Sequence, residues 1–172
     1  MDIEIRPCRP GDEQALAAVG QATFLETYAG IVDGADILAH SYGPHSVETY
    51  RAFLARPDYQ LFLAAAEPGE APVGYTVFSP PDLPVPVGEG DVELKRIYVL
   101  HRFHGDKVGP RLLRAGLDWA RAKGFRRMLL GAYGENHRAI AFYRRNGFEQ
   151  VGVRVFRVGA RDYDDVVLAV NL

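Results

Sequence analysis

The chain has 172 residues, of which 48% are hydrophobic and 24% charged, and its formal net charge is -2. This composition is typical of a globular protein, and we expect a single domain over residues 1–172. The charge argues against nucleic acid as a partner, because nucleic-acid-binding surfaces are clearly basic. The one cysteine, Cys8, excludes an internal disulfide and a zinc site built from several thiolates.

The sequence also suggests where the protein works. A single thiol fits a reducing compartment. The N-terminal residues lack the apolar stretch of a signal peptide, and no segment approaches the roughly 18 apolar residues of a membrane span. We therefore expect a soluble, cytoplasmic protein without a membrane partner.

The first half of the chain predicts one strand, a set of helices and then two strands. Ile3 and Ile5 alternate with charged residues, which is typical of a strand. Apolar residues recur at helical spacing after Gly11, and Asp12 is a plausible N-cap. The other elements expected here are a short helix within 28–44, a helix over 47–55, and strands over 59–66 and 73–78.

The second half opens with a loop over residues 79–90. This segment, SPPDLPVPVGEG, holds four Pro and two Gly residues, and Pro neither donates to a sheet nor adopts helix-interior geometry without cost. The order of elements predicts an α/β fold with a mixed sheet and helices on both faces. The remaining expected elements are a strand over 91–100, a helix opened by Pro110, a strand over 126–131, a helix within 134–148, and strands over 150–158 and 163–170.

The connection from Tyr98 to Leu113 joins a buried strand to a helix and is a candidate anion site. A helix N-terminus carries unpaired N–H donors and the positive end of the helix dipole, which suits a pyrophosphate. Gly105 and Gly109 would let the backbone approach a ligand closely, and Lys107 would add a positive charge. The same residues also suit an ordinary strand-to-helix turn. The segment is neither a Walker P-loop nor a GxGxxG dinucleotide motif.

Two segments together resemble the GNAT (Gcn5-related) superfamily of N-acetyltransferases. ELKRIYVLHRFHGDKVGPRLL is similar to the strand, loop and helix that bind the pyrophosphate of coenzyme A, usually with the pattern Q/R-x-x-G-x-G/A. NHRAIAFYRRNGFEQVG is similar to a later helix and strand of the family. The match is firm over residues 91–152 and follows element order elsewhere. It implies a mixed, mostly antiparallel sheet, acetyl-CoA as co-substrate and no metal.

The loop departs from the family pattern at two positions. His104 stands where Gln or Arg is usual, and Lys107 stands where the first Gly is usual. Since Lys cannot take a positive φ as cheaply as Gly, either the loop bends differently, Lys107 is strained, or its charge compensates. The coenzyme contacts that the resemblance implies are Ile97, Tyr98, Val99, His104, Gly105, Asp106, Lys107, Val108, Gly109, Pro110, Asn136, Tyr143 and Arg145.

The resemblance implies direct transfer of an acetyl group from the thioester to a primary amine in a ternary complex. In that reaction Asn136 would face the pantetheine arm and Tyr143 would protonate the leaving thiolate. An amine with a pKa near about 10 must first lose a proton, and Glu93 is the candidate base. Each role has a plainer alternative: Tyr143 as an aromatic anchor of its helix, and Glu93 as an ion-pair partner of Lys95 or Arg96.

The acceptor amine is the least defined part of this hypothesis. The segment ATFLETYAG and the late VFRVGARDYDD resemble the polyamine-acetylating branch, with Glu26 and Tyr28 as candidate acceptor contacts. Further acids, Asp33, Asp36 and Glu48, would attract a polycation or are ordinary surface charges. A protein N-terminus, another small amine, and a non-catalytic acyl-CoA sensor are the alternatives. The family also provides precedent for a homodimer.

Overall fold

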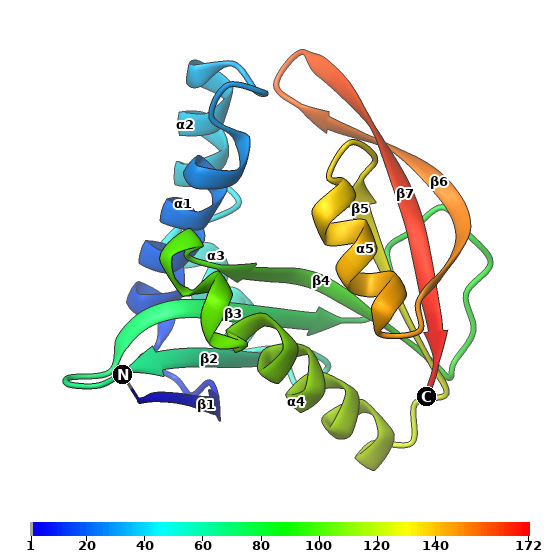
Figure 1. Ribbon diagram of the computed structural model, residues 1–172, viewed down its shortest axis with the longest axis horizontal. Helices are drawn as coiled ribbons and strands as arrows, with labels where there is room; N and C mark the ends of the chain where they lie inside the picture. Colours follow the sequence, from blue (N-terminus) through cyan, green and yellow to red (C-terminus); the bar gives the residue numbers. More distant parts are fainter. Residues whose placement is uncertain (1) are drawn as a thin grey trace. The chain divides into compact units, whose positions relative to one another are not determined.

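The computed structural model describes residues 2–172 (Figure 1). The strands form one seven-stranded sheet in the order β1-β2-β3-β4-β5-β7-β6. In chain order the elements are β1 (Ile3–Pro7), α1 (Glu13–Tyr28), α2 (Gly34–Tyr42), α3 (Val47–Leu54), β2 (Gln60–Ala66), β3 (Ala71–Ser79), β4 (Asp91–Val99), the 3₁₀ helix η1 (His101–Asp106), α4 (Val108–Ala122), β5 (Arg127–Tyr133), α5 (His137–Arg145), β6 (Glu149–Val158) and β7 (Arg161–Asn171).

The sheet is mixed, as expected from the sequence. β4 and β5 run parallel, whereas β1 with β2, β2 with β3, β5 with β7, and β6 with β7 run antiparallel. The prediction of a mixed, mostly antiparallel sheet with α-helices is therefore confirmed. None of the helices in residues 2–172 combines the length and the apolar character that spanning a membrane requires.

The chain divides into two compact units. Unit 1 consists of Met1–Phe78 and Arg96–Gly116, and unit 2 of Ser79–Lys95 and Leu117–Leu172. The divisions fall within β4 and within α4, so both of these elements are continuous through the two units. The expectation of a single domain over residues 1–172 stays a prediction.

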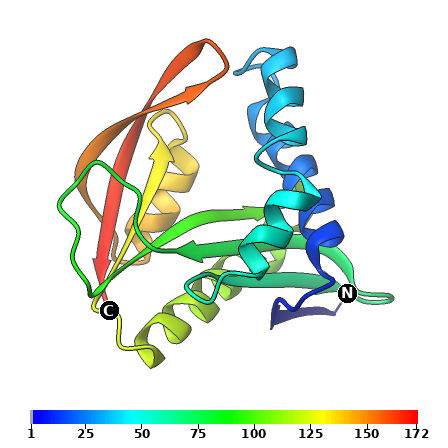
Figure 2. The same cartoon turned by 180° about the vertical axis from the view of Figure 1, so that it is seen from behind.

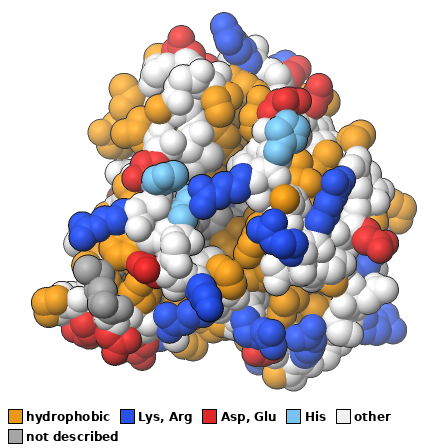
Figure 3. All heavy atoms as spheres, viewed as in Figure 1, with side chains coloured by type: hydrophobic (Ala, Val, Ile, Leu, Met, Phe, Trp, Pro, Cys, Tyr) orange, Lys and Arg blue, Asp and Glu red, His pale blue; other side chains and the backbone are white. Residues whose placement is uncertain are grey.

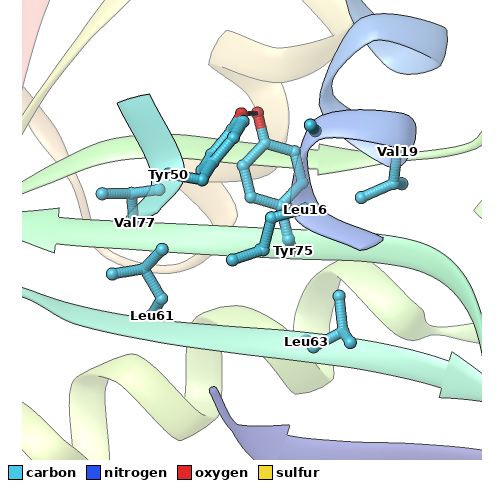
Figure 4. Close-up of a cluster of buried hydrophobic side chains, with 8 residues drawn as sticks. Leu16, Val19, Tyr50, Leu61, Leu63, Tyr75 and Val77 are labelled. Carbon is cyan, nitrogen blue, oxygen red and sulfur yellow. Dashed lines mark hydrogen bonds between the residues drawn. The ribbon is translucent and has the colours of Figure 1, made fainter. Parts of the chain in front are cut away.

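Unit 1 has helices on both faces of its strands (Figures 1 and 2). Side chains of β3 alternate between the two faces, as the pleat of a strand requires. Tyr75 and Val77 join a core cluster with α1 and α3, while Gly74 and Phe78 lie against α4. Figure 4 shows the cluster between the strands and α1 and α3, which comprises Leu16, Ala17, Val19, Tyr50, Leu61, Leu63, Tyr75 and Val77.

On the other face of unit 1, α4 approaches β3 closely. Gly116 lies directly against the ring of Phe78, and a Cβ atom built on Gly116 would come within 2.6 Å of two ring carbons. Phe78 is fully buried, so the ring has little room to move away. A glycine at this position therefore sets how close α4 sits to the strands.

Unit 2 has its own small core, to which the proline-rich loop contributes. Leu83 of this loop packs with Leu129 of β5 and with Val167 and Ala169 of β7. Residues 80–90 contain no helix or strand, so the predicted loop is confirmed except at Ser79, which is the last residue of β3. The loop nevertheless covers part of the core, because Leu83 is buried in it and Val85 packs against it.

The ends of α4 and α5 lie where the sequence predicted them, whereas the start of α4 does not. Gly124 and Gly147 follow α4 and α5 with φ of +83° and +88°, the left-handed geometry that ends helices. The prediction that Pro110 opens α4 was wrong, because α4 begins two residues earlier at Val108. Proline fits at the third helical position too, since an N–H there has no intrahelical acceptor.

Candidate active site

The loop between η1 and α4 contains a non-glycine residue in left-handed backbone geometry. Lys107 has φ +58° and ψ +22°. The structure thus answers the question that the sequence left open: Lys107 takes the bend for which the family usually has Gly. A left-handed lysine costs about 1–2 kcal/mol relative to its ordinary conformations.

Behind Lys107, the first turn of α4 offers backbone donors. The N–H groups of Val108 and Gly109 stand in the first helical positions, where no intrahelical acceptor exists, and Arg111 N already donates to Lys107 O at 3.1 Å. No atom lies within 4 Å of a Cβ built on Gly105 or Gly109. The loop surface is therefore open to close approach by a ligand, which fits a pyrophosphate.

His104 is turned back onto the end of β4. Its Nε2 lies 2.8 Å from the carbonyl oxygen of Val99. Because a carbonyl only accepts, Nε2 carries the proton and donates this bond. His104 thus fastens η1 to the strand.

The strand ahead of the loop pairs with β5 at its beginning. The register of β4 with β5 covers Asp91, Val92 and Glu93. Ile97, Tyr98 and Val99 lie beyond this pairing. Leu100 N, just after the strand, donates to Val73 O at 2.9 Å.

In unit 2, Asn136 opens the helix whose sequence resembles the second family segment. Asn136 is the N-cap of α5, and its Oδ1 accepts a hydrogen bond of 3.1 Å from Ala139 N. This bond satisfies one of the unpaired donors of the helix start. The amide nitrogen of the same side chain makes no hydrogen bond within unit 2 and keeps its donor capacity for a ligand.

Tyr143 lies two turns further along α5 and is 8% exposed. Its ring packs between those of Phe142 and Phe148, with centroid distances of 5.3 and 5.8 Å. Arg145 follows in the exposed last turn of the helix. On the face drawn in Figure 3, basic and acidic side chains are interspersed.

Glu93 is 3% exposed and has a clear structural partner. Its Oε2 accepts a hydrogen bond of 2.7 Å from the backbone N–H of Asp82, in the proline-rich loop. The sequence suggested Lys95 or Arg96 as the partner, whereas the contact found is to the backbone. Glu93 therefore anchors the loop, whether or not it also takes up a proton.

The acidic residues of α1, α2 and α3 have local functions. Glu26 Oε2 accepts from His101 N at 3.0 Å, which ties the end of α1 to the start of η1. Asp33 caps α2 by accepting from Ala35 N at 2.9 Å. Asp36 and Glu48 stand in first helical turns, where a negative charge favours the helix dipole. Tyr28 packs against Phe24, with ring centroids 4.6 Å apart.

The sequence analysis missed a polar cluster in unit 1. Arg96 Nη1 donates to Tyr50 Oη at 3.0 Å. Tyr50 in turn donates to Tyr75 Oη at 2.8 Å, the bond drawn in Figure 4. His45 Nδ1 lies 2.8 Å from the Tyr50 hydroxyl. The alternation of Arg96 and Tyr98 along β4 shows that the two share a face, but no sequence pattern reports that α3 packs over that face.

Burial keeps the histidine of this cluster neutral. His45 is 2% exposed, and burial together with the positive charge of Arg96 lowers its pKa to about 2. Elsewhere, burial raises the pKa of the Cys8 thiol to about 12, so this thiol is protonated at neutral pH and is a poor nucleophile. Residues 2–172 contain no group of three or more His, Cys, Asp and Glu side chains that could hold a metal ion.

Comparisons with known proteins agree with the residue patterns. A sequence model of the acetyltransferase (GNAT) family matches residues 31–148, more than half of the chain. An uncharacterised N-acetyltransferase of Mycobacterium tuberculosis is 31% identical over 171 residues, which cover 94% of this chain and 98% of the relative.

Two solved structures show the same fold. The PaiA N-acetyltransferase of Thermoplasma acidophilum, in complex with coenzyme A, is 22% identical, with a TM-score of 0.78 and 100% of both chains covered. An acetyltransferase of the GNAT family from Streptococcus pneumoniae is 21% identical, with a TM-score of 0.75, over 99% of this chain and 100% of the other.

Proposed function

Because the chain belongs to the GNAT family of N-acetyltransferases, we propose that it transfers an acetyl group from acetyl-CoA to a primary amine by direct attack in a ternary complex. The observation that carries this proposal is the start of α4. There the open loop, the left-handed Lys107 and the N–H donors of the first helical turn support a binding surface for a pyrophosphate.

Within unit 1, the coenzyme would contact backbone groups more than side chains. The loop from Gly105 to Pro110 would receive the pyrophosphate, with the charge of Lys107 added. The backbone of Ile97, Tyr98 and Val99 would pair with the pantetheine amides. From unit 2, we assign coenzyme contacts to Asn136 and Arg145.

The chemical step needs a proton donor and a proton acceptor. We assign Tyr143 to the protonation of the leaving thiolate, since a phenol has a pKa close to that of a thiol and its donated proton prevents re-attack. We assign Glu93 to the removal of the amine proton, directly or through a water molecule. The hydrogen bond from Asp82 N holds this carboxylate in one orientation and leaves its Oε1 without a bond inside unit 2.

For the acceptor, the residue pattern supports a polyamine, with Glu26 and Tyr28 as contacts. The acids that would form a polycation site have local partners or stand at helix starts, so their presence alone adds little to this assignment. A cytoplasmic location and a homodimer stay predictions.

The decisive experiment combines binding and turnover. Calorimetric titration should show micromolar or tighter binding of acetyl-CoA, and release of free coenzyme A should follow when a primary amine is added. Tyr143→Phe keeps the packing against Phe142 and Phe148 but removes the hydroxyl. This variant should bind acetyl-CoA like the wild type and lose about a hundred- to ten-thousandfold in kcat. Full activity of Tyr143→Phe would contradict its role as the acid.

A further inference from the structure

We propose that Arg96 binds a carboxylate of the acceptor, so that the acceptor is a small amine that also carries a carboxylate. The proposal rests on the acetyl transfer proposed above and replaces the polyamine with a different class of acceptor. It predicts the opposite charge preference from that of a polyamine site.

Arg96 carries a positive charge that its own unit does not neutralise. Among the described residues of unit 1, no carboxylate forms an ion pair with its guanidinium. Nη1 donates to Tyr50, whereas Nε and Nη2 donate to no group of the unit. Arg96 thus presents two open donors from a partly buried position.

The groups around Arg96 are neutral at pH 7. His45 and His40 have pKa values lowered to about 2 and about 4 by burial and by the charge of Arg96. Burial raises the pKa of the Tyr50 and Tyr75 phenols, which therefore stay protonated. The side chains that contact or face the guanidinium from α2, α3, β3 and the segment before α3 supply no negative charge.

Aromatic rings compensate for only part of this charge. The guanidinium lies 5.3 Å from the ring centroids of both Tyr50 and Phe53. Each such contact contributes about 0.5–2 kcal/mol, while the removal of a cation from water costs several kcal/mol. An anion bound at Nε and Nη2 would offset the rest of the cost of removing the cation from water. The planar guanidinium matches a carboxylate in geometry.

The position of Arg96 in the sheet connects this anion site with the acetyl group. Arg96 directly precedes Ile97, the first residue of the segment assigned to the pantetheine arm, and neighbouring Cα atoms are about 3.8 Å apart. Its side chain points to the face of α1–α3, as does that of Tyr98. A carboxylate held by Arg96 would therefore place the amine of the same small molecule within reach of the thioester.

Matched pairs of amines test the proposal without any mutation. Each pair has the same spacing, and a carboxylate in one member is replaced by an aminomethyl group in the other. Suitable pairs are β-alanine with propane-1,3-diamine and 4-aminobutanoate with butane-1,4-diamine, and 4-aminobutanamide serves as a neutral reference. We expect the better amino acid to have at least a tenfold higher kcat/KM than its diamine and its amide. A diamine that reacts faster than its amino acid overturns the proposal and supports the polyamine.

Variants then assign the preference to one side chain. Arg96→Gln should reduce kcat/KM for the amino acid about tenfold to a hundredfold and abolish the preference for the amino acid over the diamine. Arg96→Lys should restore part of the preference for the amino acid over the diamine. It is the second variant to measure if Arg96→Gln fails to fold. Arg56→Gln is the matched control, because Arg56 also lies over an aromatic ring but is exposed and paired with Asp58. Equal losses for both amines in Arg96→Gln would overturn the assignment.

A binding experiment distinguishes a failure of this inference from a failure of the proposed function. If no amine is acetylated, titration of the wild type with 4-aminobutanoate and with glutarate tests whether the anion site exists. Saturable binding that is lost in Arg96→Gln would support an anion site while the acetyltransferase proposal fails. No saturable binding of either carboxylate would overturn the anion site as well.

Discussion

The carboxylate of Glu93 accepts a hydrogen bond of 2.7 Å from the backbone N–H of Asp82, so the proposed base also holds the proline-rich loop. A glutamine keeps the accepting oxygen but cannot take up a proton at neutral pH. We expect Glu93→Gln to unfold at the same urea concentration as the wild type. Its kcat/KM for the amine should fall about a hundred- to ten-thousandfold if Glu93 is the base.

Glu93→Ala is the companion variant, because it removes the acceptor as well. The N–H of Asp82 then loses its partner, which should lower the free energy of unfolding by about 1–3 kcal/mol. An active Glu93→Gln beside a destabilised Glu93→Ala would assign Glu93 to loop support alone.

The left-handed backbone of Lys107 should lower the free energy of unfolding of the protein. Lys107→Gly should raise the free energy of unfolding by about 1 kcal/mol, since glycine takes this geometry without a clash, although it also gains freedom in the unfolded chain. Lys107→Ala keeps the strain and removes only the charge, so its urea midpoint should stay close to that of the wild type. Calorimetry on both variants separates the effect of the charge on acetyl-CoA binding from that of the backbone. A destabilised Lys107→Gly would contradict the strain.

The contact between Gly116 and Phe78 predicts a large effect of one methyl group. Gly116→Ala should lower the free energy of unfolding by about 1–3 kcal/mol, because the added carbon overlaps a buried ring. Gly109→Ala, in the same helix, is the control, since no atom lies within 4 Å of its Cβ position. Urea titrations of the two variants should differ in midpoint, and equal midpoints would disprove the close approach of α4.

The two histidines near Arg96 predict how stability changes with pH. Their pKa values are lowered by burial and by the charge of Arg96, from an ordinary 6.5 to about 4 for His40 and about 2 for His45. Between these values and 6.5 the unfolded chain binds more protons than the folded one, so the free energy of unfolding should fall as the pH falls. The slope is at most about 1.4 kcal/mol per pH unit for each histidine.

Urea unfolding between pH 7.5 and pH 5 measures this slope. His45→Asn should reduce it, because one of the two groups no longer titrates. Asp12, whose pKa is lowered chiefly by its bond with Arg6, loses its contribution only below its ordinary value of 3.8 and does not affect this range. The same slope in His45→Asn and in the wild type would contradict a neutral, buried His45.

The sequence was informative where a feature depends on neighbouring residues. Asn136, Gly147 and the proline-rich loop were recognised because caps, turn glycines and proline act locally. The start of α4 was misplaced because Pro110 is compatible with more than one helical position. The cluster around Arg96 could not be found in this way, since it joins residues 46 positions apart in the chain through the packing of α3 on β4.

Within the site, the sequence identified the candidate side chains but not their local partners. The sequence showed that Lys107 replaces a usual glycine of the loop. Only the backbone angles show that Lys107 adopts the left-handed geometry and that the loop does not bend differently. The bonds of His104 to Val99 O and of Glu93 to Asp82 N depend on rotamers that no residue pattern specifies.

The bond between Glu26 and His101 N would couple the binding of the two substrates if Glu26 contacts the acceptor. The same carboxylate is a candidate contact for the acceptor and a support for the first residue of the coenzyme loop. An acceptor that changes the position of Glu26 changes the affinity for acetyl-CoA, and by reciprocity acetyl-CoA changes the affinity for the acceptor by the same factor. Substitutions of Glu26 should therefore alter the dissociation constants of both substrates, and their ratio will report the coupling between them.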